Sequence, residues 1–157
     1  MVFATNIKRL DLNPFAKHHK FMNYWLIKSE PYKWSWDDQV KKGVEHWDGV
    51  RNYQASNNMK AMKNGDRAFF YHSNEGKEIV GIVEVVKEYY PDHTDHKGRF
   101  GMVDFKAIKP LKTPVTLTDI KSDPNLDNMA LLKQSRLSVS PVKAEEWHYI
   151  LEKSGTD

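Results

Sequence analysis

The residues best suited to hold a ligand lie in one short stretch, Trp47-Asp48-Gly49-Val50-Arg51-Asn52-Tyr53-Gln54-Ala55. It combines a Trp, a turn-forming Asp-Gly pair, an Arg, an Asn and a Tyr. A segment that only packs a core would be mostly aliphatic, and a segment that only faces water would lack large aromatic rings. Flat rings beside amide and guanidinium donors suit a concave site for a flat polar ligand.

The sequence contains no motif of a common enzyme class. It has no phosphate-binding Gly-x-x-x-x-Gly-Lys-Ser/Thr loop, no Gly-x-Gly-x-x-Gly, no Gly-x-Ser-x-Gly and no His-Glu-x-x-His. Cysteine is absent, which excludes thiolate catalysis, zinc-thiolate sites and iron–sulfur clusters and fits a reducing compartment. We therefore predict a protein that is not an enzyme and that carries no cofactor.

The run Asp92-His93-Thr94-Asp95-His96 is the cluster whose composition comes nearest to a metal site. Two His three positions apart can share one face of a helix. This run, however, follows Pro91 and precedes Gly98, which favours a solvated loop over a helix. We predict no metal site from the sequence.

The composition is that of a soluble globular domain, with 39% hydrophobic and 29% charged residues in a chain of 157. No apolar run approaches the ~20 residues of a membrane span, so we expect no membrane partner. The net charge of +3 resides in residues 1–21, because residues 22–157 carry 20 Lys and Arg against 20 Asp and Glu. A neutral domain gives little electrostatic indication of nucleic-acid binding. We expect a cytoplasmic protein, or a nuclear one in a eukaryote.

Residues 1–21 differ in character from the rest. They mix Asn, Pro and Lys with a His18-His19 pair, without sustained periodicity or the apolar segment of a secretory signal. We predict a flexible N-terminal extension over 1–21 and one folded domain over 22–157.

The hydrophobic patterns of the folded part predict a mixture of strands and short helices. Gly81 interrupts an Ile- and Val-rich strand, which often marks a bulge or the close approach of another group. Pro110 and Pro114 are expected to end the fourth strand. The predicted strands are 23–28, 66–73, 78–88, 99–109 and 135–140. The predicted helices are 35–43, 52–63 and 144–152, with helical turns at 116–121 and 128–132. This favours an α+β fold with a small mixed barrel or curled sheet of about five strands and peripheral helices.

The five Trp residues do not all suggest the same role. We interpret Trp34, Trp36 and Trp147 as core residues packed against short helices. Trp25, in its strand, is interpreted as a core residue as well. Trp47 differs, because Arg51 and Asn52 separate it from Tyr53 and make a mixed polar and aromatic surface.

Four segments resemble the EVE domain family in order and spacing, and the resemblance spans about 22–153. They are Asn23–Pro31, Trp47–Ala55, Phe70–Asn74 and Gln134–Val139. The resemblance implies a PUA-like fold, a small and partly open mixed β-barrel with flanking short helices. It also implies kinship with domains that hold a modified base, flipped from its strand, in an aromatic pocket.

The function that the resemblance implies is the non-enzymatic reading of a modified base, with modified cytosine in DNA, such as 5-methylcytosine, as the first candidate. Modified RNA is a second candidate. Carried over by position, the residues implied to bind the ligand are Trp25, Lys28, Ser29, Glu30, Trp47, Val50, Arg51, Asn52, Tyr53, Tyr71, His72, Ser73, Arg136 and Ser138.

Two other functions stay open on the sequence. The same pocket would suit a free nucleoside-like small molecule, or it would catalyse a reaction on a base with Glu30 or Asp48 as the acid or base. We expect a monomer whose phosphate contacts come from Lys28, Arg51, Lys60, Lys63 or Arg136. Each of these functions requires the four segments, which are far apart in sequence, to lie close together in space.

Overall fold

The computed structural model describes residues 22–157, and the extension expected over 1–21 lies outside the described residues. The strands are β1 (Tyr24–Ser29), β2 (Val44–His46), β3 (Arg67–His72), β4 (Glu78–Pro91), β5 (Gly101–Thr116) and β6 (Val139–Val142). The helices are α3 (Trp36–Lys42), α4 (Tyr53–Ala61), α5 (Leu117–Lys121), the 3-10 helix η1 (Pro124–Leu126), α6 (Ala130–Lys133) and α7 (Ala144–Ser154). Within 22–157, no helix is both long enough and apolar enough to span a bilayer.

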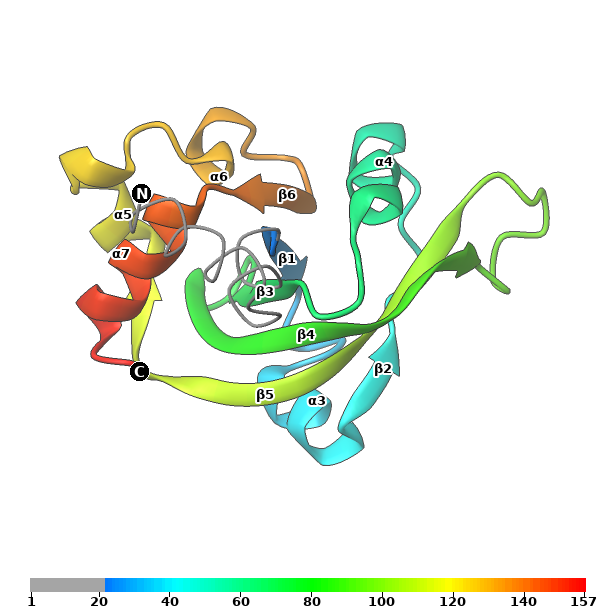
Figure 1. The fold of residues 1–157 in the computed structure, drawn as a ribbon, viewed down its shortest axis with the longest axis horizontal. Helices are drawn as coiled ribbons and strands as arrows, with labels where there is room; N and C mark the ends of the chain where they lie inside the picture. Colours follow the sequence, from blue (N-terminus) through cyan, green and yellow to red (C-terminus); the bar gives the residue numbers. More distant parts are fainter. Residues whose placement is uncertain (1–21) are drawn as a thin grey trace, which may run out of the picture.

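The strands form one mixed sheet in the order β2-β5-β4-β3-β1-β6. β1 runs parallel to β3, and the other neighbours are antiparallel. β4 and β5 make a long curved hairpin, with α5 and α7 on the left in Figure 1 and α4 and β2 on the right. The predicted α+β class with a partly open sheet is confirmed, with six strands in place of about five.

Each face of the sheet carries a hydrophobic cluster, since alternate strand residues point to opposite sides. Trp25 and Ile27 enter one hydrophobic cluster and Leu26 enters the other. The first core also contains Trp36, Val50, Met59, Phe70, Phe105 and Val139, with Trp34 and Trp47 packed against it. The second core contains Phe69, Tyr71, Ile79, Ile120, Leu126, Trp147 and Ile150.

Both ends of α3 are fixed by residues next to it in the chain. Ser35 caps its N-terminus by accepting from Asp38 N at 3.1 Å, and the Asp38 carboxylate accepts from Ser35 N at 3.0 Å. This is a capping box, which satisfies two backbone donors of the first turn. Gly43 ends the helix with φ 82°, a conformation that favours glycine.

Gly81 also behaves as its place in a strand predicts. The register of β4 with its neighbours shifts next to Gly81. A Cβ atom at this position would lie 2.5 Å from the Trp36 ring. The glycine therefore permits the close approach of an aromatic ring to the sheet.

Several predicted elements differ from the structure. β4 continues to Pro91 instead of ending at 88, and the 3-10 helix η1 was not predicted. β2 was not predicted at all, because three half-exposed residues give no hydrophobic pattern. β5 continues through Pro110 and Pro114, since β2 pairs only with 104–106 and the later part of β5 has a free edge where a Pro needs no donor. The last strand begins at 139 instead of 135, and 134–136 form a turn before it.

Candidate binding cavity

One cavity of about 740 Å³ opens beside the first core. Its volume lies in the range of about 300–1,000 Å³ found for small-molecule sites. It is lined by Lys28–Glu30, Lys33, Trp34, Glu45–Arg51, Ser73, Ser135, Arg136 and Ser138. Each of the four segments that resemble the EVE domain thus contributes to its wall.

The sheet brings the first, third and fourth segments together. Because β1 and β3 are parallel neighbours, Ser29 lies opposite His72 and both strands finish at the same edge. Ser73 N donates to Ser29 O at 2.9 Å, and Lys28 N donates to Ser138 O at 3.0 Å. The strand ends and the turn before β6 therefore form a continuous backbone scaffold.

Lys28 fixes the turn before β6 through its side chain as well. Its Nζ donates to Ser135 O at 2.7 Å. Burial lowers the pKa of the Lys28 ammonium from its usual range. The side chain is half-buried and lines the cavity, and its hydrogen bond holds Ser135 at the rim.

The second segment forms the opposite wall. Trp47 N donates to Val103 O at 2.8 Å, which continues the β2–β5 pairing by one residue. The Trp47 ring meets Phe70 and Phe105 edge-to-face at centroid distances of 5.8 and 5.7 Å. The indole is therefore fixed by the core on one side and partly exposed to the cavity on the other.

Asp92, a buried residue outside the cavity wall, holds this segment in place. Its carboxylate accepts from Gly49 N at 2.8 Å, Arg51 Nη1 at 3.0 Å and Thr94 Oγ1 at 2.6 Å. Burial alone would raise the pKa of Asp92, but the hydrogen bonds from Thr94, Gly49 and Arg51 outweigh it and hold the pKa well below the usual range. The carboxylate is ionised at neutral pH and orients the Arg51 guanidinium.

Glu30 is also ionised, and its oxygens are occupied. They accept from Tyr32 OH at 2.7 Å and from the Asn74 amide, and Lys33 Nζ lies 3.1 Å away. The hydrogen bond from Tyr32 and then that from Lys33 lower the Glu30 pKa. A general acid at neutral pH needs a raised pKa, so this environment does not favour that role for Glu30.

Nine of the residues expected at the site line the cavity: Lys28, Ser29, Glu30, Trp47, Val50, Arg51, Ser73, Arg136 and Ser138. Five do not: Trp25, Asn52, Tyr53, Tyr71 and His72.

The contacts of these five side chains explain why they do not line the cavity. Trp25 is buried in the first core, and its Nε1 donates to Asp66 Oδ2 at 3.1 Å. Tyr71 alternates to the other face of β3 and enters the second core. Asn52 caps α4 by accepting from Ala55 N at 2.9 Å.

The remaining two lie beside the wall. His72 Nε2 accepts from Trp36 N at 3.0 Å, and burial lowers the His72 pKa, so the neutral imidazole serves as an acceptor for α3. Tyr53 is 60% exposed and packs against Phe100 with ring centroids 4.8 Å apart.

Seven further residues line the cavity that were not among the ligand-binding residues expected from the sequence: Lys33, Trp34, Glu45, His46, Asp48, Gly49 and Ser135. Asp48 was considered from the sequence only as the acid or base of a catalysed reaction. Trp34 was expected in the core; it packs against the first core and also lines the cavity. Asp48 and Gly49 lie inside the aromatic stretch itself, so a rule that took the whole stretch would have found them. Ser135 lies inside the fourth family segment, Gln134–Val139, so the same rule would have found it. Lys33 carries no comparable signal.

The family model described as the EVE domain matches residues 23–153 of this chain. The chain belongs to the EVE domain family. Mouse thymocyte nuclear protein 1 is 35% identical over an alignment that covers 86% of this chain and 75% of the relative. This EVE domain is therefore related to eukaryotic proteins over nearly its whole folded part.

Solved structures match this EVE domain closely. A Rhodopseudomonas palustris protein solved by NMR is 61% identical, with a TM-score of 0.82 and coverage of 85% of this chain and 94% of that one. The human THYN1 protein, crystallised in complex with DNA containing 5-methylcytosine, is 34% identical, with a TM-score of 0.81 and coverage of 87% and 99%. The predicted PUA-like fold is confirmed by these matches.

Proposed function

We propose that this EVE domain is a non-enzymatic DNA-binding module that holds a modified cytosine, flipped out of its strand, in the cavity. The observation that carries the proposal is the position of Trp47. A partly exposed indole, fixed edge-to-face by Phe70 and Phe105, forms one wall of a cavity about 740 Å³ in volume. The human relative crystallised with 5-methylcytosine DNA has the same fold and supports the same ligand class.

The cavity offers what a flipped base requires. Stacking on an aromatic side chain contributes roughly 1–3 kcal/mol per base. Trp34 and Trp47 both line the cavity and present such rings. Ser73 and Ser138 also line the cavity and offer hydrogen-bonding groups for the base edge, whereas the Ser29 hydroxyl donates to Trp34 O and can only accept from a base. A ring and a few hydrogen bonds offset the few kcal/mol that extrusion of a base costs.

The side chain best placed to distinguish 5-methylcytosine from cytosine is Val50. It is an apolar lining residue that is only 8% exposed. An apolar contact is how proteins read the equivalent methyl group of thymine. Burial of one methyl-sized group is worth about 0.8 kcal/mol, which corresponds to about fourfold in affinity. We therefore expect a modest preference for 5-methylcytosine over cytosine, which depends on the apolar contact with Val50.

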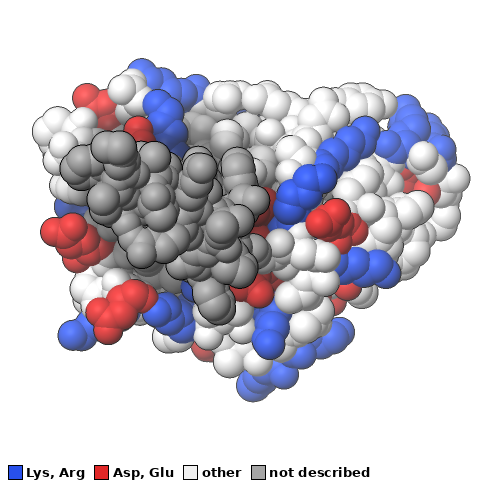
Figure 2. Space-filling model, viewed as in Figure 1, with Lys and Arg blue, Asp and Glu red and all other residues white. Residues whose placement is uncertain are grey.

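The surface charge supports binding that depends on the pocket more than on the phosphate backbone. Lys33 and Arg136 lie at the cavity and supply cations near it. On the face shown in Figure 2, however, Lys and Arg are interspersed with Asp and Glu. Since 22–157 is formally neutral, we expect low affinity for DNA without the modified base.

Fluorescence polarisation with two duplexes of identical sequence, one with cytosine and one with 5-methylcytosine at a single position, tests the proposal. The wild type should bind the methylated duplex about fourfold more tightly. Trp47→Ala should weaken that binding by about 5- to 150-fold, the equivalent of one lost stacking contact. Val50→Ala should remove the preference and leave most of the affinity.

His148→Ala is the matched control, since it removes an exposed ring on α7 that does not line the cavity. Equal affinity for both duplexes, unchanged by Trp47→Ala, would contradict the proposal. A thermal shift with free nucleoside, without oligonucleotide binding, would assign the cavity to a small molecule instead. A matched RNA oligonucleotide decides between DNA and RNA.

A further inference from the structure

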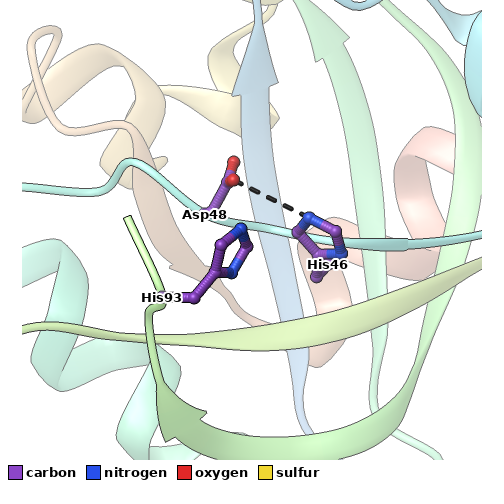
Figure 3. A group of neighbouring side chains, drawn as sticks. All are labelled: His46, Asp48 and His93. Carbon is purple, nitrogen blue, oxygen red and sulfur yellow. Dashed lines mark ion pairs between the residues drawn. The ribbon is translucent and has the colours of Figure 1, made fainter. Parts of the chain in front are cut away.

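Three potential metal ligands lie together at one side of the cavity: His46, Asp48 and His93. Their ligand atoms all lie within 4.8 Å of one another. His46 Nε2 is 3.7 Å from Asp48 Oδ2, and the two imidazoles meet edge-on with centroids 5.1 Å apart. Figure 3 shows the three side chains pointing toward one another from two separate segments of the chain.

The backbone that carries these residues is well fixed. His46 ends β2, where it lies opposite Asp104 of β5. Asp48 follows two positions later, so in extended chain its side chain points to the same side as that of His46. His93 follows Asp92, whose carboxylate binds Gly49 N at 2.8 Å. The loop after β4 is thereby held against the 47–49 segment.

A fourth residue, Glu45, lies behind the His46 ring. Glu45 Oε1 lies 3.4 Å from His46 Nδ1, on the opposite side of the ring from Asp48. A carboxylate beside Nδ1 favours the tautomer with the proton on Nδ1, which leaves the Nε2 lone pair free toward Asp48. A carboxylate behind a His is the usual second-sphere partner of a metal ligand.

We propose that His46, Asp48 and His93 bind a divalent transition metal of the zinc type. A tetrahedral ion with bonds of about 2.0–2.1 Å holds its ligand atoms about 3.4 Å apart. The 3.7 Å pair is already close to that spacing, and the ligand atom of His93, an exposed side chain, lies within 4.8 Å of the other two. Two imidazoles with one carboxylate suit Zn²⁺ and its neighbours, whereas Ca²⁺ and Mg²⁺ prefer oxygen ligands alone.

The site would leave one coordination position open. Three protein ligands supply three of the four positions of a tetrahedral ion. His46 and Asp48 line the cavity, so the cluster lies at the cavity wall. An ion bound there would also link the loop after β4 to the cavity wall, which the hydrogen bonds of Asp92 already hold together. The proposal does not depend on the nature of the cavity's ligand.

Equilibrium dialysis of the full chain against Zn²⁺, with metal analysis, tests the proposal. The background is His18→Ala/His19→Ala, which removes the adjacent His pair outside the described residues. We expect one Zn²⁺ per chain. His93→Ala and Asp48→Asn should each weaken binding by at least tenfold. Glu45→Gln should weaken it by about 10- to 100-fold, as outer-sphere partners do.

His96→Ala is the matched control, an exposed His in the same loop that is not part of the cluster. It should bind Zn²⁺ like the background. Co²⁺ substitution gives a second readout, because a tetrahedral nitrogen and oxygen set produces visible absorption bands that His93→Ala should abolish. Circular dichroism confirms that each variant is folded. No bound Zn²⁺ in the background, or binding that His93→Ala and Asp48→Asn leave unchanged, would overturn the proposal.

Discussion

Trp47 and Trp147 contact neighbouring residues of one strand from opposite faces, and their surroundings differ. Trp147, from α7, stacks on Phe69 at a centroid distance of 3.9 Å and on Tyr24 at 4.5 Å, and is 2% exposed. Trp47 meets Phe70 only edge-to-face, at 5.8 Å, and keeps part of its ring free. The same side chain is a core residue on one face and a cavity wall on the other.

The cause of the difference is the element that covers each ring. Trp147 lies on a helix that packs its apolar side against the second core, so the indole is enclosed together with Ile150. Trp47 lies in an extended segment between β2 and α4 and is only partly buried among residues 22–157. A ring that the fold covers contributes to folding stability, and a ring that it leaves uncovered is available to a ligand.

The largest effect that separates the two faces should come from Trp147→Ala. Loss of a fully enclosed indole leaves a cavity, and we expect the free energy of unfolding to fall by about 3–5 kcal/mol. Urea denaturation followed by circular dichroism measures it. Trp47→Ala is the matched comparison and should cost clearly less, since part of its ring is already in water. Equal losses would remove the distinction between the faces.

On the cavity side, Asp92→Asn should lower the free energy of unfolding by about 1.5–3 kcal/mol, the range for a hydrogen bond to a charged group. The amide accepts fewer hydrogen bonds than the carboxylate that binds Gly49, Arg51 and Thr94. Urea denaturation at pH 7 measures it. An unchanged stability would show that Asp92 does not hold the cavity wall.

The pH dependence of the same variant sharpens this result. The folded-state pKa of Asp92 lies below the ~3.9 of an unfolded Asp. The unfolded state therefore takes up a proton first, and the stabilisation present above about pH 4 is lost as the pH falls below it. Asp92→Asn should show a shallower acid loss. Part of the loss of stability at low pH should remain in this variant, because Asp123 also contributes to it. Hydrogen bonds from Tyr149 and then Lys153 lower the pKa of Asp123 to about 2.

A smaller loss of about 1–3 kcal/mol is expected for Gly81→Ala, which overpacks the first core. The added methyl group would lie 2.5 Å from the Trp36 ring. Thermal unfolding of the single variant and of Gly81→Ala/Trp36→Phe measures the effect. The smaller Phe ring should recover part of the stability that the methyl group removes in the Trp36 background, and additive losses would contradict the close packing.

The smallest effect is expected for Ser140→Ala. Ser140 Oγ is buried and has no hydrogen-bond partner among residues 22–157. The substitution removes no hydrogen bond and relieves the cost of burying an unpaired hydroxyl. The free energy of unfolding should therefore stay unchanged or rise by up to about 1 kcal/mol. Ser56→Ala is the control, since Ser56 Oγ pairs with Tyr89 OH at 2.8 Å and its loss should be destabilising. A greater loss for Ser140→Ala than for Ser56→Ala would show a hidden partner.

Local rules predicted the parts of the fold that neighbouring residues decide. Ser35 caps α3 and Gly43 ends it, as their types and positions indicate. The glycine in β4 permits a close approach, as a strand Gly suggests. The four family segments were recognised from the sequence, and each contributes to one cavity. The helix cap and the helix end depend on backbone propensities and on residues close together in the chain, whereas the approach of Trp36 to Gly81 and the meeting of the four segments depend on the tertiary structure.

The sequence by itself thus determined the α+β class, the family and the segments that surround the cavity. Only the tertiary structure decided which aromatic rings stay uncovered, so that Trp25 enters the core and Trp34 lines the cavity. It also decided that His93 lies beside His46 instead of acting with His96. The physical reason is that exposure and ligand geometry depend on strand pairings between residues many positions apart, and no local pattern encodes them.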